Sequence, residues 1–151
     1  MRKIILIISI LFYSCIAEEP IYGINIDPRV QPYVNKFLTD AEAYGVNVSD
    51  FYLQGISITI GDNLPRAGNA GGAAYRKNEH GIEIIIRESF WNKSYDLSRE
   101  IIIYHELAHD YFNLNHNEDL LFLRADVKTR WVGFEDRHYQ EFFDYVNDNR
   151  N

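Results

Sequence analysis

The sequence of 151 residues is poor in cysteine, in methionine and in clustered positive charge. Its one cysteine is Cys15, so no disulfide can form within the chain and the fold must rest on its core, with or without a metal ion. Lysine and arginine number 15 against 22 aspartates and glutamates, which gives a net charge of −7, and no basic cluster occurs. Because the electrostatic attraction to phosphate is missing, we expect no nucleic-acid partner.

The sequence also has no internal repeats and no apolar run long enough to span a bilayer. Aromatic residues, in contrast, are frequent: the chain has 11 tyrosines, 9 phenylalanines and 2 tryptophans. With a hydrophobic content of 46% they are sufficient for a core, and the length leaves no room for a second domain. We therefore expect one globular domain, whose oligomeric state the sequence does not indicate.

The first residues are typical of a bacterial export signal. Arg2 and Lys3 give the positive start, and residues 4–13 form a nearly unbroken apolar run. Cys15 follows directly, in a context that resembles the lipobox of bacterial lipoproteins, where the cysteine thiol carries a diacylglyceryl group. We predict a lipoprotein signal peptide over residues 1–14 and a mature protein anchored through a lipid on Cys15 alone, in the periplasm or on the cell surface.

An alternative cleavage site lies after Ala17, where Cys15 and Ala17 make a small-x-small pattern. Cleavage there would release a secreted soluble protein. Removal of residues 1–14 takes away two cations and no acidic residue, so the net charge changes from −7 to −9. We assign residues 15–26 to a tether and residues 27–151 to the folded domain.

Apolar periodicity predicts the first elements of this domain. Asp27 followed by Pro28 is typical of a helix start, with Asp27 as the N-cap. Apolar residues at helical spacing continue to Tyr44, and Gly45 stands where a C-terminal cap belongs. Residues 56–60 alternate between isoleucine and a hydroxyl residue, which predicts a strand with one covered face.

The second half of the domain is predicted to hold a hairpin and two helices. Residues 73–76 and 82–87 form the two strands of the hairpin. A helix begins with Asp96 as its N-cap and ends near residues 113–115. The segment 120–132 is irregular or a short helix, and apolar spacing from Tyr139 onward predicts a closing helix. This order of elements indicates the α+β class.

One motif in the predicted helix from Asp96 carries chemistry. The sequence His-Glu-Leu-Ala-His of residues 105–109 puts His105 and His109 on the same face, where both imidazoles can reach one metal ion. Glu106 is offset by one residue, close enough to touch a metal-bound water without being a ligand. Catalytic zinc takes three protein ligands and keeps one position open, so a third ligand must come from elsewhere.

His116 is the first candidate for this third ligand. If the helix breaks at residues 113–115, Asn113 can adopt the left-handed conformation that ends helices, and the chain can turn back beneath the ion. Glu135 is the second candidate. Three further carboxylates are weaker candidates: Asp110, Glu118 and Asp119.

These motifs resemble those of the zincin zinc metallopeptidases, with their His-Glu-x-x-His signature, and more closely the small metalloprotease-type lipoproteins of Bacteroidetes-type bacteria. The matching parts, in chain order, are a strand at residues 82–86, Trp91, the 105–109 motif, a histidine seven residues later at His116, and a similar ending at residues 137–143. The resemblance implies a zincin-like α+β domain. Its small, mostly antiparallel sheet would have a hairpin edge strand and pack on an N-terminal helix and the active-site helix.

The chain is also similar to the metzincins, but departs from them at two points. Their third histidine comes six residues after the second with a glycine between, whereas here the separation is seven and the glycine is absent. Met1 is the only methionine, so the methionine turn of that clan is also absent. Ala108 replaces the glycine usual in the lipoprotein group.

The resemblance implies a zinc-dependent endopeptidase, which hydrolyses peptide bonds with a metal-activated water and Glu106 as general base. One edge of the hairpin, at residues 73–76 or 82–87, would pair with an extended peptide or protein substrate. Tyr139 or His138 would stabilise the oxyanion; the alternatives are a core tyrosine and a surface histidine. Zn²⁺ is the expected cofactor because three imidazoles favour it in a tetrahedral site.

Two other functions remain open from the sequence. The first is a catalytically inactive, zinc-containing surface lipoprotein that binds a peptide or protein partner. The second is a structural lipoprotein without metal, in which the three histidines are incidental. Cleavage specificity is not indicated by the residues.

Overall fold

The computed structural model describes residues 23–62, 64, 72–76, 81–131 and 133–150. The predicted signal peptide, the predicted lipidation site Cys15 and most of the predicted tether lie outside these ranges, as does most of the loop before the hairpin. Within them, no helix combines the length and apolar character needed to cross a membrane.

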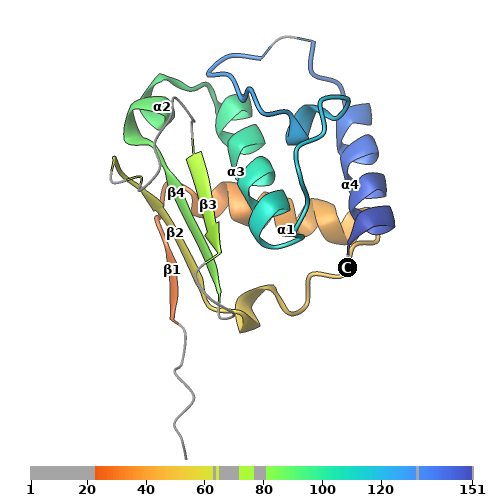
Figure 1. The fold of residues 1–151 in the computed structure, drawn as a ribbon, viewed down its shortest axis with the longest axis horizontal. Helices are drawn as coiled ribbons and strands as arrows, with labels where there is room; N and C mark the ends of the chain where they lie inside the picture. The colour runs from red at the N-terminus through yellow and green to blue at the C-terminus, as the bar shows by residue number, and fades with distance from the viewer. Residues whose placement is uncertain (1–22, 63, 65–71, 77–80, 132, 151) are drawn as a thin grey trace, which may run out of the picture.

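The domain contains both helices and strands, with most of the strands before most of the helices, in agreement with the predicted α+β class. The elements are β1 (Ile24–Ile26), α1 (Gln31–Ala43), β2 (Ile56–Ile60), β3 (Gly72–Arg76), β4 (Ile82–Ile86), α2 (Glu88–Lys93), α3 (Asp96–Asp110) and α4 (Arg137–Asn149), with two short 3₁₀ turns, η1 (Phe51–Leu53) and η2 (Leu121–Leu123). Helices α1, α3 and α4 lie on one side of the sheet, with α3 nearest to the hairpin (Figure 1).

The four strands form one mixed sheet in the order β1-β2-β4-β3. Strands β1 and β2 are parallel, as are β2 and β4, and only the hairpin pair β3–β4 is antiparallel. The prediction of a mostly antiparallel sheet is therefore wrong. The physical reason is the connection through α1, which returns the chain to the starting end of the sheet, as parallel pairing requires. Of the two hairpin strands only β3 lies at an edge, so β4 is excluded as a docking edge.

The predicted tether is shorter than expected because its last residues form β1. Ile24 pairs with Ile56 and Ile26 with Ile58. The backbone N–H of Asp27 then donates to the Ile58 carbonyl, at 2.8 Å, which extends the pairing by one residue. Asp27 therefore continues the strand pairing beyond Ile26, and α1 starts three residues later than predicted, at Gln31 instead of Pro28, with Val30 as its N-cap.

The end of α1 agrees with the prediction. Gly45 has a φ of +78°, the left-handed conformation that glycine adopts without strain. Its N–H donates to the Glu42 carbonyl at 3.0 Å, and the N–H of Val46 donates to the Ala41 carbonyl at 2.8 Å. This pair of hydrogen bonds is a Schellman motif, which satisfies the last carbonyls of the helix.

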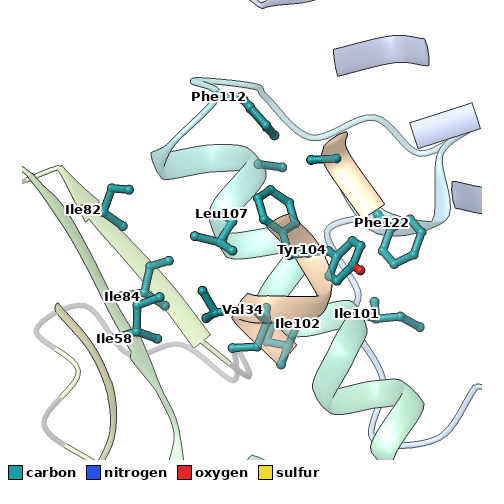
Figure 2. Packing of buried hydrophobic residues seen from close by; sticks show 14 of the residues in the cluster. Val34, Ile58, Ile82, Ile84, Ile101, Ile102, Tyr104, Leu107, Phe112 and Phe122 are labelled. Carbon is teal, nitrogen blue, oxygen red and sulfur yellow. The ribbon is translucent and has the colours of Figure 1, made fainter. Parts of the chain in front are cut away.

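The core lies between the sheet and the helices. Ile58, Ile82 and Ile84 point from the sheet toward Val34 of α1 and Leu107 of α3 (Figure 2). Helix α3 is covered on nearly all sides, with ten of its 15 residues buried. A helix in this position cannot slide or rotate without breaking packing on several fronts, so it is a rigid support for any side chain that it carries.

Two differences from the predicted helices are small. Helix α3 begins at Asp96, but its N-cap is Tyr95, one residue earlier than predicted. The six-residue helix α2 was not predicted, because its apolar residues Phe90 and Trp91 are adjacent and give no helical periodicity. The closing helix α4 is confirmed.

Candidate metal centre

Helix α3 places His105 and His109 one turn apart, as the sequence predicts. Their ring centroids are 4.4 Å apart, with the ring planes at 88°. The two Nε2 atoms face each other at 3.1 Å. The side chains therefore converge on a common point beside the helix.

The Nδ1 atom of each histidine is held by a backbone carbonyl. His105 Nδ1 lies 3.0 Å from the Phe122 carbonyl oxygen, and His109 Nδ1 lies 2.7 Å from that of Leu114. A carbonyl can only accept, so each Nδ1 carries the proton and donates it. This leaves the Nε2 lone pairs for a metal ion, as in proteins where a second interaction orients the ligating histidine.

The chain after α3 brings His116 to the same point. Asn113 has a φ of +58°, the left-handed conformation expected of it at the helix end. The N–H of Leu114 then donates back to the Ala108 carbonyl at 2.9 Å, so the chain reverses. The His116 ring centroid lies 4.6 Å from that of His109 and 5.3 Å from that of His105.

The three histidines together could hold one ion. One ligand atom from each lies within 4.8 Å of the other two, and among the described residues no other set of three or more histidine, cysteine or carboxylate side chains does so. The site grades from a buried His105 through a half-buried His109 to an exposed His116. It therefore has an open side, which faces the solvent at His116.

Burial keeps the two helix histidines neutral. It lowers the pKa of His105 to about 3, helped by the nearby rings of His109 and His116 and opposed by the hydrogen bond to Phe122. Burial also lowers the pKa of His109. Neutral imidazole is the form that binds metals, so this part of the site is ready for an ion at neutral pH.

Glu106 is buried, with 4% of its surface exposed, and sits between the two helix histidines in sequence. Its Cα is about 100° around the helix from that of His105, since an α-helix has 3.6 residues per turn. The side chain therefore leaves the helix beside the histidine face, as the sequence predicts.

The alternative third ligands are placed elsewhere. Glu135 is exposed and pairs with Arg137, at 2.7 Å between Oε2 and Nε. Glu118 accepts from the N–H of Ala125, and neither it nor the exposed Asp119 joins the histidine group.

Asp110 is buried at the end of α3 and accepts from the backbone N–H of Glu83, at 2.8 Å. This contact fastens the helix that carries His105 and His109 to the central strand β4. Local sequence patterns do not indicate this contact, because it joins residues 27 positions apart.

The structure does not bring Tyr139 to the histidines. Its hydroxyl donates to the Glu100 carboxylate, and the ammonium of Lys36 lies 4.3 Å from its ring centre. Glu100 is five residues before His105, which is about 140° around the helix and so on the far side. The predicted role in stabilising an oxyanion therefore lacks a geometric basis, and the alternative of a half-buried core tyrosine describes its position.

The other proposed oxyanion residue, His138, also lies away from the centre. Its Nδ1 contacts the backbone of Glu135 at the start of α4.

Two further groups of the site could not be predicted from the sequence: the backbone carbonyls of Phe122 and Leu114, which hold His105 and His109. Every residue has a backbone carbonyl, so the residue type does not show which one accepts a hydrogen bond from a histidine.

Comparison with known proteins gave no further assignment: no protein-family model, no curated protein and no solved structure matches this chain.

Proposed function

We propose that this chain is a zinc-dependent endopeptidase of zincin type, in which His105, His109 and His116 hold the ion and Glu106 is the general base. The observation that carries the proposal is the convergence of the Nε2 atoms of His105 and His109, 3.1 Å apart, while each Nδ1 is bound to a carbonyl. Ordinary surface histidines have no reason to be oriented in this way.

The donor set fits zinc. With Zn–N distances of about 2.0–2.1 Å, two imidazole nitrogens of a tetrahedral site are roughly 3.3 Å apart. The Nε2 atoms of the helix pair are at 3.1 Å. Three imidazole ligands favour zinc over magnesium or calcium, which prefer oxygen ligands. A fourth position would remain for water on the exposed side at His116.

When bound, zinc would lower the pKa of a coordinated water and polarise the carbonyl of a peptide bond. The three histidines fix the place of this chemistry, and Asp110 fixes the helix to the sheet. Glu106 takes a proton at its carboxylate from the attacking water and gives it to the leaving amine. Because Glu106 is not a ligand, replacing it should reduce peptide hydrolysis without reducing zinc binding.

An extended peptide or protein substrate has a docking edge next to this centre. Strand β3 is at the end of the sheet, and α3 packs against it. A peptide added to this edge would receive main-chain hydrogen bonds along its length. This would hold the substrate beside the helix that carries the histidines. The further proposal of an exported lipoprotein, anchored at Cys15, rests on the signal sequence alone.

Metal content is the first experiment. Residues 18–151 and a His116→Ala variant, both purified without chelator, are analysed by mass spectrometry after dialysis against zinc. We expect about one zinc per chain in the parent and much weaker retention in the variant. A parent without metal would overturn the proposal.

Glu106→Gln then separates the endopeptidase from a zinc-containing protein that only binds a partner. General acid–base catalysis contributes about 10²–10⁴ in rate, so peptide hydrolysis should fall by that factor while zinc content stays the same. Hydrolysis by the parent of an unfolded protein mixture, read by mass spectrometry, supplies the reference. A zinc-loaded parent that cleaves nothing would favour the partner-binding function.

A further inference from the structure

A single segment after α3 supplies three parts of the metal centre. Residues 114–123, here called the ligand loop, contain the carbonyl that holds His109, the third histidine, and the carbonyl that holds His105. Loops are usually the more mobile parts of a fold. The geometry of the centre therefore depends on what fixes this loop.

Backbone hydrogen bonds close the ligand loop on itself. The N–H of Asn117 donates to the Leu123 carbonyl at 3.0 Å, and the N–H of Leu120 donates to the Asn117 carbonyl at 3.2 Å. Asn117 also accepts from the N–H of Asp119 through its side chain, at 3.0 Å. Because Asn117 follows His116 directly, the position of His116 is tied to the 121–123 end of the loop.

Phe122 fastens that end to the core. Its side chain is fully buried, and its ring stacks on Tyr104 at 5.0 Å with an interplanar angle of 22°. The Phe142 ring of α4 contacts it from another side, at 5.1 Å. Tyr104 precedes His105 on α3, and Figure 2 shows its ring next to that of Phe122. The ring of Phe122 thus contacts Tyr104, and the carbonyl of Phe122 holds His105, the next residue along α3.

We infer that Phe122 is the positioning residue of the metal centre: its ring, fixed against Tyr104, sets its carbonyl at His105 Nδ1 and, through the Asn117–Leu123 hydrogen bond, places His116. The centre is therefore preformed before metal binds. The inference rests on the proposed zinc site, but its first test does not require metal.

The first test measures histidine tautomers in the metal-free protein by ¹⁵N–¹H correlation spectra. In the parent, both helix histidines should carry the proton on Nδ1. In Phe122→Leu, His105 should populate the Nε2–H form, whereas His109 should keep Nδ1–H because its acceptor is Leu114. Phe143→Leu is the matched control: Phe143 is equally buried and its ring packs on Phe37, on Tyr44 and, at 6.2 Å, on the same Tyr104, but its ring contacts do not include Phe122. It should leave both tautomers unchanged.

The second test measures Co²⁺ affinity from the visible absorption of the bound ion. Changes to groups that orient metal ligands typically weaken affinity by about 10–100-fold, so Phe122→Leu should lose that much and Phe143→Leu less than about twofold. If the leucine variant does not fold, Phe122→Met is used in both tests. Equal losses in the two variants, or an unchanged His105 tautomer in the Phe122 variant, would overturn the inference. A parent that binds no Co²⁺ would instead contradict the proposed zinc site, and the tautomers would still decide the role of Phe122.

Discussion

The two halves of the proposed metal centre are built by different means. His105 and His109 come from a helix that is buried on nearly all sides, and their spacing follows from helical geometry. His116 comes from a loop, lies on the exposed side of the centre, and depends on one left-handed residue and a few backbone hydrogen bonds. The helix fixes the spacing of its two histidines through its own geometry, whereas the position of His116 depends on a few specific contacts, among them the packing of Phe122 on Tyr104.

This difference suggests a division of tasks. The helix half would fix where an ion and Glu106 lie relative to the sheet edge, because Asp110 joins the same helix to β4. The loop half completes the ligand set from the solvent side. We expect that changes in either half weaken zinc binding, but for different reasons.

The largest effect should come from removing a ligand of each half. His109→Ala deletes a ligand and also the donor to the Leu114 carbonyl, so the loop loses an anchor at the same time. His116→Ala deletes a ligand only. Both should weaken zinc binding more than the roughly 10–100-fold typical of changes outside the ligand set, with His109→Ala about tenfold worse. Competition with a chelator measures this, and an equal loss would contradict the proposed difference between the halves.

The pH dependence of the free energy of unfolding should show the effect of burying His105 in the helix half. The folded-state pKa of His105 is about 3, so between pH 6.5 and pH 3 the unfolded chain binds a proton there that the folded chain does not. Stability of the metal-free protein must then decrease as the pH falls through this window. From pH 6.5 to 4.5, we expect His105 alone to contribute a loss of about 2 kcal/mol in urea unfolding. The variant His105→Asn should have a flatter profile, and an equal slope in both would exclude His105 as the cause.

A smaller effect should follow from straining the loop half. In Asn113→Val, a β-branched residue is forced into the left-handed conformation, which costs about 1–2 kcal/mol. Zinc affinity should decrease with stability, because His116 follows this turn. Asn113→Gly should keep both properties, and Asn115→Val, at another exposed loop position, is the matched control. Equal behaviour of the two valine variants would mean that the left-handed turn does not control the site.

The smallest effect should come from the far side of α3. Tyr139→Phe removes the hydrogen bond to Glu100 and should lower the free energy of unfolding by about 1 kcal/mol. Zinc affinity and peptide hydrolysis should stay within about twofold of the parent. A large decrease in hydrolysis alone would restore Tyr139 as an oxyanion residue. Tyr145→Phe, in the same helix, controls for loss of a tyrosine hydroxyl in α4.

The sequence was sufficient for those parts of the centre that local rules determine. Helical spacing placed His105 and His109, and the tolerance of asparagine for the left-handed region indicated the turn at Asn113. The same local rules identified the hairpin and the glycine cap of α1. They worked because each depends on residues within one turn or one strand pair.

Long-range relations were beyond those rules. The parallel pairing of β1 with β2 depends on contacts across α1, and so residues 24–26 were assigned to a tether. Tyr139 belongs to the ending at residues 137–143 that resembles the lipoprotein group, but its partner Glu100 places it on the side of α3 away from His105. Its place could not follow from its residue type, because the crossing of α4 over the core decides which face it meets.

The shortness of the ligand loop has a consequence for the order of folding. The hydrogen bond that joins His105 to Phe122 closes 17 residues, whereas the pairing of β1 with β2 joins residues 32 apart, such as Ile24 and Ile56. Contacts between nearby residues form faster, because less chain has to be brought together. We therefore expect that, when the complete chain refolds, α3 and its loop close and assemble the proposed zinc site before β1 pairs with β2.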